Sequence, residues 1–339
     1  MDWGHSVEAS LIAAISFGAT LIACRLVRHL GVVDAPDGAR KTQAHAVPRL
    51  GGLAIALGAG LALIPATLFG GAPVTDLGAH HASLLIAALT GLVFAVGLWD
   101  DVWTANTKLK LVVTAAACIA VAILGLQPEA LTTPFGDITL PAVMIIGSAA
   151  WLLVFINAVN FMDGANGFAM GSLAIMFCGL ALTGTVAGNF ELTLWWFALL
   201  GGFIAFLSIN LRGRLYAGDA GALGAGALFA SLGLVSGLSI WTIATLALPF
   251  LIDVLMTLIW RAKHGRNWLE PHLDHAYQRM IAAGWSHLDV SILYWGLSAV
   301  SAIAAYIAAQ GGGDAPFAVF WALCVAGILL WIRHRRAAE

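Results

Sequence analysis

The sequence predicts an all-α, polytopic membrane protein with about eleven transmembrane helices. Only 10% of the residues are charged and 60% are hydrophobic, whereas soluble domains usually carry about 25% charged residues. The mean hydropathy is +0.91. The apolar residues form long runs, and a helix needs roughly 20 such residues to cross a bilayer. The runs lack the two-residue alternation of barrel strands, so helices are the expected spanning form.

The apolar runs follow one another along the whole chain, so we expect one integral-membrane domain over residues 1–339. No basic segment precedes the first run, and we expect that span to be retained rather than cleaved as a signal peptide. The expected spans lie at about 7–27, 50–69, 82–99, 109–126, 141–157, 167–186, 191–210, 219–237, 239–260, 288–309 and 315–332.

The basic residues predict the orientation of these spans. All sixteen Lys and Arg residues follow an odd-numbered run, and none lies in the connections at 70–81, 127–140, 187–190 and 310–314. The positive-inside rule places the ends of the odd runs and the C-terminus in the cytoplasm, and the N-terminus outside. We therefore expect a multi-pass protein of the cytoplasmic (inner) membrane. The net charge of −2 gives no indication of a nucleic-acid partner.

The polar motifs share one side of the membrane. Clusters of acidic, amide and histidine residues lie only in connections on the expected cytoplasmic side, at 31–52, 99–108, 157–167, 210–221 and 261–287. The chain is therefore expected to build one polar surface, with an active site on cytoplasmic loops.

The segment NAVNFMDGANG, residues 157–167, stands between two apolar runs. Asn157, Asn160 and Asp163 are three residues apart, so they share one face of a helical end. The alternative is a capped hairpin, but one cap needs one such residue, and this segment holds more. A ligand-binding turn is the favoured interpretation.

Two adjacent carboxylates, Asp100 and Asp101, end the third run in the motif GLWDD. At a helix C-terminus they oppose the helix dipole and repel each other, and a cation would relieve both penalties. Mg²⁺ is usually held by one or two carboxylates together with substrate phosphates. A solvated helix end is the alternative.

Three further candidates lie in the segment NLRGRLYAGDAG. Asn210 ends the seventh run, and Asp219 stands in a glycine-rich start of the eighth, where an N-cap is the alternative role. Tyr216 offers an aromatic face for a base, although a tyrosine of the membrane interface is equally consistent with its position.

Two basic segments suggest phosphate contacts. RKTQAHAVPRLGG contains Lys41, His45 and Arg49, which favour a phosphate clamp, with membrane anchoring as the alternative. The segment 261–287 contains four histidines among basic residues. Two neutral imidazoles without a cysteine are a weak zinc signal, and a pyrophosphate fits the arginines better.

Asp253 lies inside the run 239–260. Acids within a membrane are costly and are usually paired or functional. The sequence does not identify a partner for it.

Together, these features suggest an enzyme that joins a polar phosphate substrate to a lipid. Phosphoryl transfer requires mainly positioning and charge neutralisation, so it needs no covalent nucleophile. The sequence contains no Walker A loop and no nucleophile elbow.

The motifs RKTQAHAVPRLGG, GLWDD, NAVNFMDGANG and NLRGRLYAGDAG, in this order, resemble the polyprenyl-phosphate N-acetylhexosamine-1-phosphate transferases. These are relatives of the phospho-N-acetylmuramoyl-pentapeptide transferase, and the resemblance covers nearly the whole chain. It implies transfer of a sugar-1-phosphate from a UDP-N-acetylhexosamine to undecaprenyl phosphate, with release of UMP. It also implies Mg²⁺ as the cofactor, with Mn²⁺ as a substitute, and it suggests a homodimer.

The resemblance implies roles for the matching residues. Asp100, Asp101 and Asp219 would be catalytic, and Asp219 and Asp101 would hold the metal, while the role of Asp100 as base or positioning group stays open. The motif 157–167 would hold the nucleotide, and Tyr216 would stack on uracil. The full set of candidate substrate-binding residues is Lys41, His45, Arg49, Asn157, Asn160, Asp163, Asn210, Tyr216, His272, His275 and Arg279.

The segment PHLDHAYQRM looks most like the branch of this family that starts O-antigen or capsule chains. That branch typically has an arginine where Leu273 stands, so only His275 matches its pattern clearly, and the role of His272 stays open. Two other functions are weighed: a transporter of an anionic solute, and a lipid glycosyltransferase that releases UDP. The transferred sugar is not identified.

Overall fold

The computed structural model describes residues 3–36, 45–69, 77–188, 191–267, 270 and 272–337. Lys41, a predicted phosphate ligand, lies outside them. Two strands, β1 (Val33–Asp34) and β2 (Val47–Pro48), pair antiparallel. The helices are α1 (Trp3–Val27), α2 (Gly51–Phe69), α3 (Leu77–Trp103), α4 (Thr107–Ile123), α5 (Pro141–Met162), α6 (Phe168–Gly184), α7 (Glu191–Asn210), α8 (Gly218–Leu234), α9 (Ile240–Lys263), α10 (Ala276–Ala282), α11 (His287–Gly311) and α12 (Ala315–Ala337).

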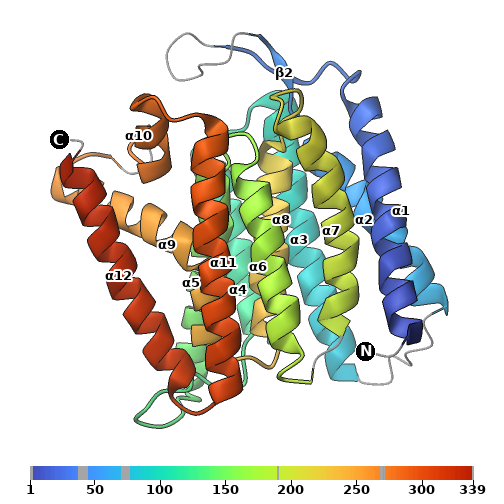
Figure 1. Ribbon diagram of the computed structural model, residues 1–339. Coiled ribbons are helices and arrows are strands. Elements are labelled where there is room, and N and C mark those ends of the chain that lie inside the picture. The colour runs from blue at the N-terminus through green and yellow to red at the C-terminus, as the bar shows by residue number, and fades with distance from the viewer. Residues whose placement is uncertain are drawn as a thin grey trace.

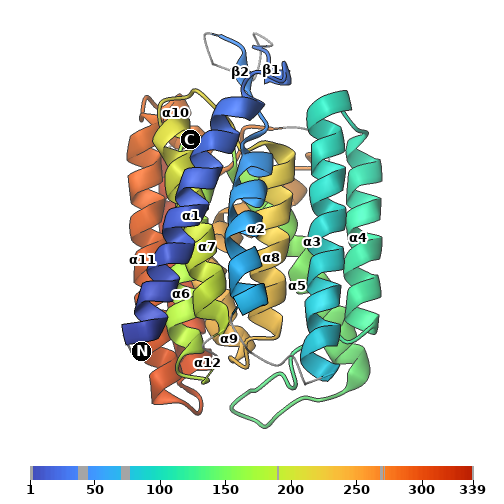
Figure 2. The same cartoon turned by 90° about the vertical axis from the view of Figure 1, so that its right-hand side faces the viewer.

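The long helices run side by side as one bundle, with the chain termini at opposite ends (Figure 1, Figure 2). Helix α1 packs on α2 and α7, α3 packs on α8, and α11 packs between α6 and α9. Helix α12 packs on α9 and α11 at one side of the bundle. The helix α8 contacts α2, α3 and α5, so it lies at the centre of the half that carries the acidic motifs.

The predicted fold class is confirmed as an all-α polytopic membrane protein. Six helices, α1, α3, α5, α9, α11 and α12, contain stretches that are long and apolar enough to cross a membrane, and shorter apolar stretches lie in α2, α6, α7 and α8. Each of the eleven predicted runs overlaps one long helix. The number of crossings and the orientation stay predictions. The short helix α10 and the strand pair lie in segments for which the sequence indicated only loops.

Local sequence signals explain several helix ends. The side chain of Asn106 accepts hydrogen bonds from two backbone N–H groups in the first turn of α4, and Pro141 opens α5, where its missing N–H costs nothing. Ser286 and Asp289 form a capping box at the start of α11. Gly167 precedes α6 with a φ of 81°, a conformation that favours glycine.

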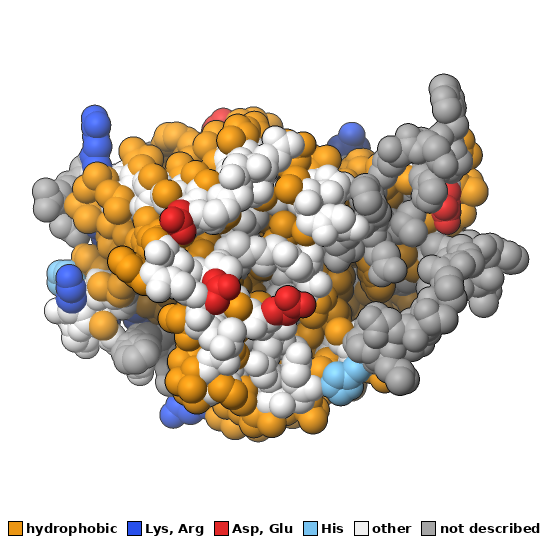
Figure 3. All heavy atoms as spheres, turned by 90° about the horizontal axis from the view of Figure 1, so that it is seen from below, with side chains coloured by type: hydrophobic (Ala, Val, Ile, Leu, Met, Phe, Trp, Pro, Cys, Tyr) orange, Lys and Arg blue, Asp and Glu red, His pale blue; other side chains and the backbone are white. Residues whose placement is uncertain are grey.

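The polar segments meet at one end of the bundle. The strands and α10 lie at the same end as the C-terminus, the upper end in Figure 1. Figure 3 shows the opposite end, where acidic side chains lie near the centre and Lys and Arg side chains lie only at the outline. Among the described residues, the middle of this face thus shows no Lys or Arg side chain, as expected for the connections at this end.

Small residues allow α2 and α8 to approach closely at this end. A β-carbon added at Gly52 would overlap the Cα and N of Gly221 in α8. The backbones are also joined directly, because the N–H groups of Gly51 and Gly52 donate to the carbonyls of Tyr216 and Ala217, each at 2.8 Å. Close approach through small residues is a common way for membrane helices to pack.

We expect the substitution Gly52→Val to separate α2 from α8 and to destabilise the protein by about 3 kcal/mol or more, because overpacking against backbone cannot relax by a side-chain rotation. Thermal unfolding of the purified protein in detergent measures this. Gly60→Val is the matched control, since Gly60 is in the same helix and a β-carbon there meets nothing within 4 Å. Equal melting temperatures for the two variants would contradict the prediction.

Candidate active site

Asp100 and Asp219 converge on one ammonium group. The Nζ of Lys110, in the first turn of α4, lies 2.8 Å from Oδ2 of Asp100 and 2.5 Å from Oδ2 of Asp219. The other oxygen of Asp100 accepts a hydrogen bond from the backbone N–H of Ala105 at 2.6 Å. Three helices, α3, α4 and α8, thus place two carboxylates around one position for a positive charge.

Asp101 has a different environment from its neighbour. Its side chain is 1% exposed, and its two oxygens accept hydrogen bonds from the backbone N–H groups of Asp219 and Ala220, both at 3.0 Å. Both N–H groups belong to the first turn of α8, where helices leave donors unpaired. Asp101 therefore caps α8 from α3 and fixes the place of Asp219. The metal-binding role predicted for Asp101 stays a prediction.

Arg49 closes the C-terminal end of α3. Its Nε donates to the backbone carbonyl of Asp101 at 2.9 Å, and its Nη2 donates to the carbonyls of Asp100 and Asp101. Its Nη1 lies 3.8 Å from Oδ1 of Asp34 on β1. A guanidinium at a helix C-terminus satisfies free carbonyls and offsets the dipole. His45, which precedes β2, is exposed.

The motif 157–167 forms the end of α5 and the turn to α6. The amide of Asn157 donates to the carbonyl of Leu153 in its own helix at 2.8 Å. The side chains of Asn160 and Asp163 are half-buried and make no hydrogen bond within the described part of the chain. Burial, followed by the negative charges of Asp219 and Asp101, raises the pKa of Asp163 well above its usual value. These charges act on Asp163 because the motif faces the acidic cluster.

Asn210 is buried and serves the backbone. Its Oδ1 accepts a hydrogen bond from the N–H of Gly167 at 2.6 Å, and its Nδ2 donates to the carbonyl of Leu215 at 2.8 Å. It therefore joins the turn after α5 to the turn after α7. These two hydrogen bonds account for the buried position of Asn210, and its contact with substrate stays a prediction. Tyr216 is half-buried, and burial, followed by the charge of Asp34, raises the pKa of its hydroxyl.

The segment after α9 is organised around Asp274. Its carboxylate pairs with Arg261, lies 3.3 Å from Nη1 of Arg266, and lies 3.9 Å from Nη2 of Arg335 in α12. Burial would raise the pKa of Asp274, but the hydrogen bond and charge of Arg261 hold it below its usual value. The guanidinium of Arg335 stacks over the ring of Trp260 at 3.6 Å. Asp274 thus ties the ends of α9 and α12 to the segment that carries the histidines.

The two predicted histidines lie together beside the 157–167 turn. The ring centroids of His272 and His275 are 4.9 Å apart, and that of His275 is 5.8 Å from the ring of Phe161. Burial, followed by the nearby His275 and Arg261, lowers the pKa of His272 to about 4. His272 is therefore a neutral imidazole near pH 7. Arg279 lies in α10, three residues past the buried start of that helix.

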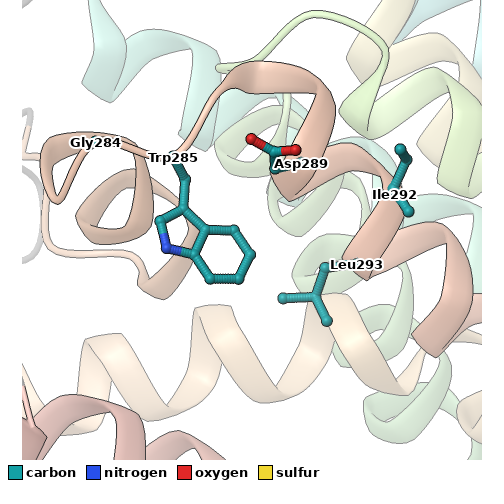
Figure 4. A pocket seen from close by; sticks show the side chains of 5 residues that line it. All are labelled: Gly284, Trp285, Asp289, Ile292 and Leu293. Carbon is teal, nitrogen blue, oxygen red and sulfur yellow. The ribbon is translucent and has the colours of Figure 1, made fainter.

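An open pocket of about 550 Å³ lies beside the turn between α10 and α11 (Figure 4). Gly284, Trp285, Asp289, Ile292 and Leu293 line it. Figure 4 shows the Trp285 ring and the Leu293 side chain beside the same space. Asp289 is already bonded to Ser286 in the capping box of α11. The lining residues include none of the predicted site residues.

Lys110 is not among the predicted site residues. In the sequence it serves only as a basic residue that marks the cytoplasmic side. A lysine in the first turn of a helix opposes the helix dipole, and this conflict was a usable signal for a nearby carboxylate.

The structure brings Asp100, Asp101, Asp219, Lys110 and Asp163 to one place. Such a cluster can bind a cation and the phosphates of a ligand, which is the chemistry of phosphoryl transfer.

Comparison with known proteins supports this chemistry. A family model described as glycosyl transferase family 4 matches residues 83–237, the part of the chain that contains the acidic cluster. The undecaprenyl-phosphate alpha-N-acetylglucosaminyl 1-phosphate transferase of Yersinia pestis is 26% identical over 310 residues, which cover 85% of this chain and 80% of that protein. Residues 83–237 are thus similar to glycosyl transferase family 4, which agrees with the resemblance that the motifs indicate.

Two other similar proteins have names that describe transferases of the same kind. The decaprenyl-phosphate N-acetylglucosaminephosphotransferase of Mycolicibacterium smegmatis is 26% identical over 339 residues, covering 87% of this chain and 81% of that protein. The phospho-N-acetylmuramoyl-pentapeptide-transferase of Leuconostoc citreum is 26% identical over 293 residues, covering 82% of this chain and 88% of that protein. The resemblance to polyprenyl-phosphate sugar-1-phosphate transferases is therefore confirmed.

Proposed function

We propose that this chain transfers an N-acetylhexosamine-1-phosphate from a UDP-sugar to undecaprenyl phosphate and releases UMP. The observation that carries the proposal is the convergence of Asp100 and Asp219 on Lys110 at one end of a membrane bundle. The names of the glycosyl transferase family 4 relatives, which act on undecaprenyl or decaprenyl phosphate, support the lipid acceptor.

In this reaction an oxygen of the acceptor phosphate attacks the β-phosphorus of the UDP-sugar. The bond from that phosphorus to the bridging oxygen breaks, and UMP leaves with the bonding electrons. A phosphate monoester has a second pKa near 6, so the acceptor is already largely ionised at pH 7. We therefore assign Asp100 a positioning role rather than that of a base, in keeping with its bonds to Lys110 and Ala105.

The carboxylates of the site fit a magnesium ion. Lys110 already holds a positive charge between Asp100 and Asp219, so their oxygens converge on a position for a cation. Mg²⁺ is usually held by one or two carboxylates, since substrate phosphates complete its shell. Asp100 and Asp219 would hold the ion, and the chemistry it supplies is neutralisation of phosphate charge.

The half-buried side chains of Asn160 and Asp163 are available to the nucleotide, and Tyr216 is available to stack on its base. His275, beside Phe161, is placed next to the same turn. We further propose that the site faces the cytoplasm, that the protein lies in the inner membrane, and that its product starts a lipid-linked glycan of the O-antigen or capsule type. The homodimer stays a prediction.

Nucleotide release from purified protein tests this proposal. Given undecaprenyl phosphate, Mg²⁺ and a panel of UDP-N-acetylhexosamines, we expect UMP with at least one sugar, and only when both lipid phosphate and metal are present. Removal of the metal with EDTA should stop release, and Mn²⁺ should restore it. Release of UDP would instead indicate glycosyl transfer without the phosphate. No release with any sugar, from folded and lipid-replete protein, would contradict the proposal and favour transport.

A further inference from the structure

A second buried carboxylate, Asp253, lies in α9 away from the acidic cluster. Its side chain is 2% exposed. A carboxylate inside a membrane bundle is costly unless it is well paired. No partner for it can be identified from the sequence, and the role proposed above for the chain does not use it.

The side chain of Asp253 contacts two other helices, α10 and α11. Its Oδ1 accepts from the backbone N–H of Ala276 at 2.8 Å, and its Oδ2 accepts from that of Tyr277 at 3.3 Å. The hydroxyl of Tyr294 in α11 donates to Oδ2 at 2.7 Å. The Nδ1 of His275 lies 3.6 Å from Oδ1. Asp253 therefore holds the start of α10 against α9 and α11.

The same helix start reaches the 157–167 turn. The Tyr277 hydroxyl donates to the carbonyl of Phe161 at 2.9 Å. A β-carbon at Gly164 would overlap that hydroxyl, so the two segments are in close contact. The ring of Phe168, which opens α6, packs on Tyr277 with centroids 4.7 Å apart. A continuous set of contacts thus runs from Asp253 through α10 to the turn that contains Asp163.

We propose that Asp253 is a positioning residue for the transfer reaction: it holds α10 so that His275 keeps its place beside the 157–167 turn. This inference rests on the function proposed above. Asp253 contacts no reacting group in this arrangement, and it acts through the segment it holds. Displacement of a supporting group by about 1 Å can lower a rate about 100-fold, so the effect on transfer is expected to be large.

Amide hydrogen exchange of the full-length protein tests the contact without any substrate. Asp253→Ala removes both acceptors, and the exchange of the Ala276 and Tyr277 amides should rise at least about tenfold. Asp253→Asn keeps one acceptor oxygen and should give a smaller rise. Ser298→Ala is the matched control: Ser298 is buried in α11, and its hydroxyl has no hydrogen-bond partner in the described structure. Unchanged exchange in both Asp253 variants would overturn the inference.

A double-mutant cycle in the UMP-release assay tests the functional part. We expect Asp253→Ala to lower kcat by about tenfold to 100-fold, and Asp253→Asn to lower it less. In a His275→Ala background, Asp253→Ala should change kcat by no more than about twofold, because the group it positions is already absent. If the losses in kcat of the two single variants instead multiply in the double variant, the positioning role would be overturned. A wild type without UMP release would instead refute the proposed function, while the exchange result still decides whether Asp253 holds α10.

Discussion

Asp219→Asn is expected to abolish transfer, with UMP release falling at least about 100-fold, as removal of one preorganised charge typically does. Asp219 is held in place twice. Its backbone N–H is bonded to Asp101, and its carboxylate is bonded to Lys110. The neutral amide keeps the shape of the side chain but removes the charge that would hold a cation. The measurement is UMP release at saturating donor, acceptor and Mg²⁺.

The control for this prediction is Asp137→Asn. Asp137 is an exposed acid in the connection at the opposite end of the bundle, and its loss should leave release unchanged. Both variants should reach the membrane fraction in equal amounts, because neither alters an apolar stretch. Wild-type turnover in Asp219→Asn would refute the assignment of the site.

Lys110→Met is expected to have two opposite effects. The ammonium lies between the carboxylates that would hold a cation. Without it, two like charges are left unneutralised. The variant should therefore bind Mn²⁺ at least about tenfold more tightly than the wild type in the absence of substrates. UMP release should nevertheless fall about 100-fold, because phosphoryl transfer depends on fixed positive charge at the phosphates. Mn²⁺ binding followed by electron paramagnetic resonance measures the first effect without any turnover.

Lys108→Met supplies the matched control. Lys108 is in the same turn of α4, but its side chain is exposed and reaches neither carboxylate. It should change neither Mn²⁺ binding nor UMP release. Weaker or unchanged Mn²⁺ binding in Lys110→Met would show that the lysine and the cation do not compete for one position.

The apolar runs predicted the helices because hydrophobicity over about 20 residues is a strong and local signal. They also placed Asp100, Asp163 and Asp219 at one end of the bundle. The strand pair at Val33 and Val47 was not predicted, because strands of two residues are too short to show an alternation of apolar and polar residues. Helix α10 escaped for a related reason: its start is fixed by Asp253, which is more than twenty residues earlier in the chain.

The roles of single polar residues were harder to predict than their location. Asp101 and Asn210 were selected as ligand-binding residues because polar side chains at helix ends suggest a site. In the structure each satisfies backbone groups of a distant segment, α8 for Asp101 and the Gly167 turn for Asn210. Spacing along one helix shows which residues share a face, but it does not show which other helix supplies the partner. Lys110 was overlooked for the same reason, since its partners come from α3 and α8.

In the proposed reaction the sugar moves together with its phosphate. A UDP-N-acetylhexosamine labelled with ³²P at the β-phosphorus tests this directly, with undecaprenyl phosphate as acceptor and extraction of the lipid product. We expect the label to enter the lipid phase, to do so only with Mg²⁺, and to stay out of it in the Asp219→Asn variant. Label that stays in the aqueous phase as UDP while the sugar enters the lipid would contradict it.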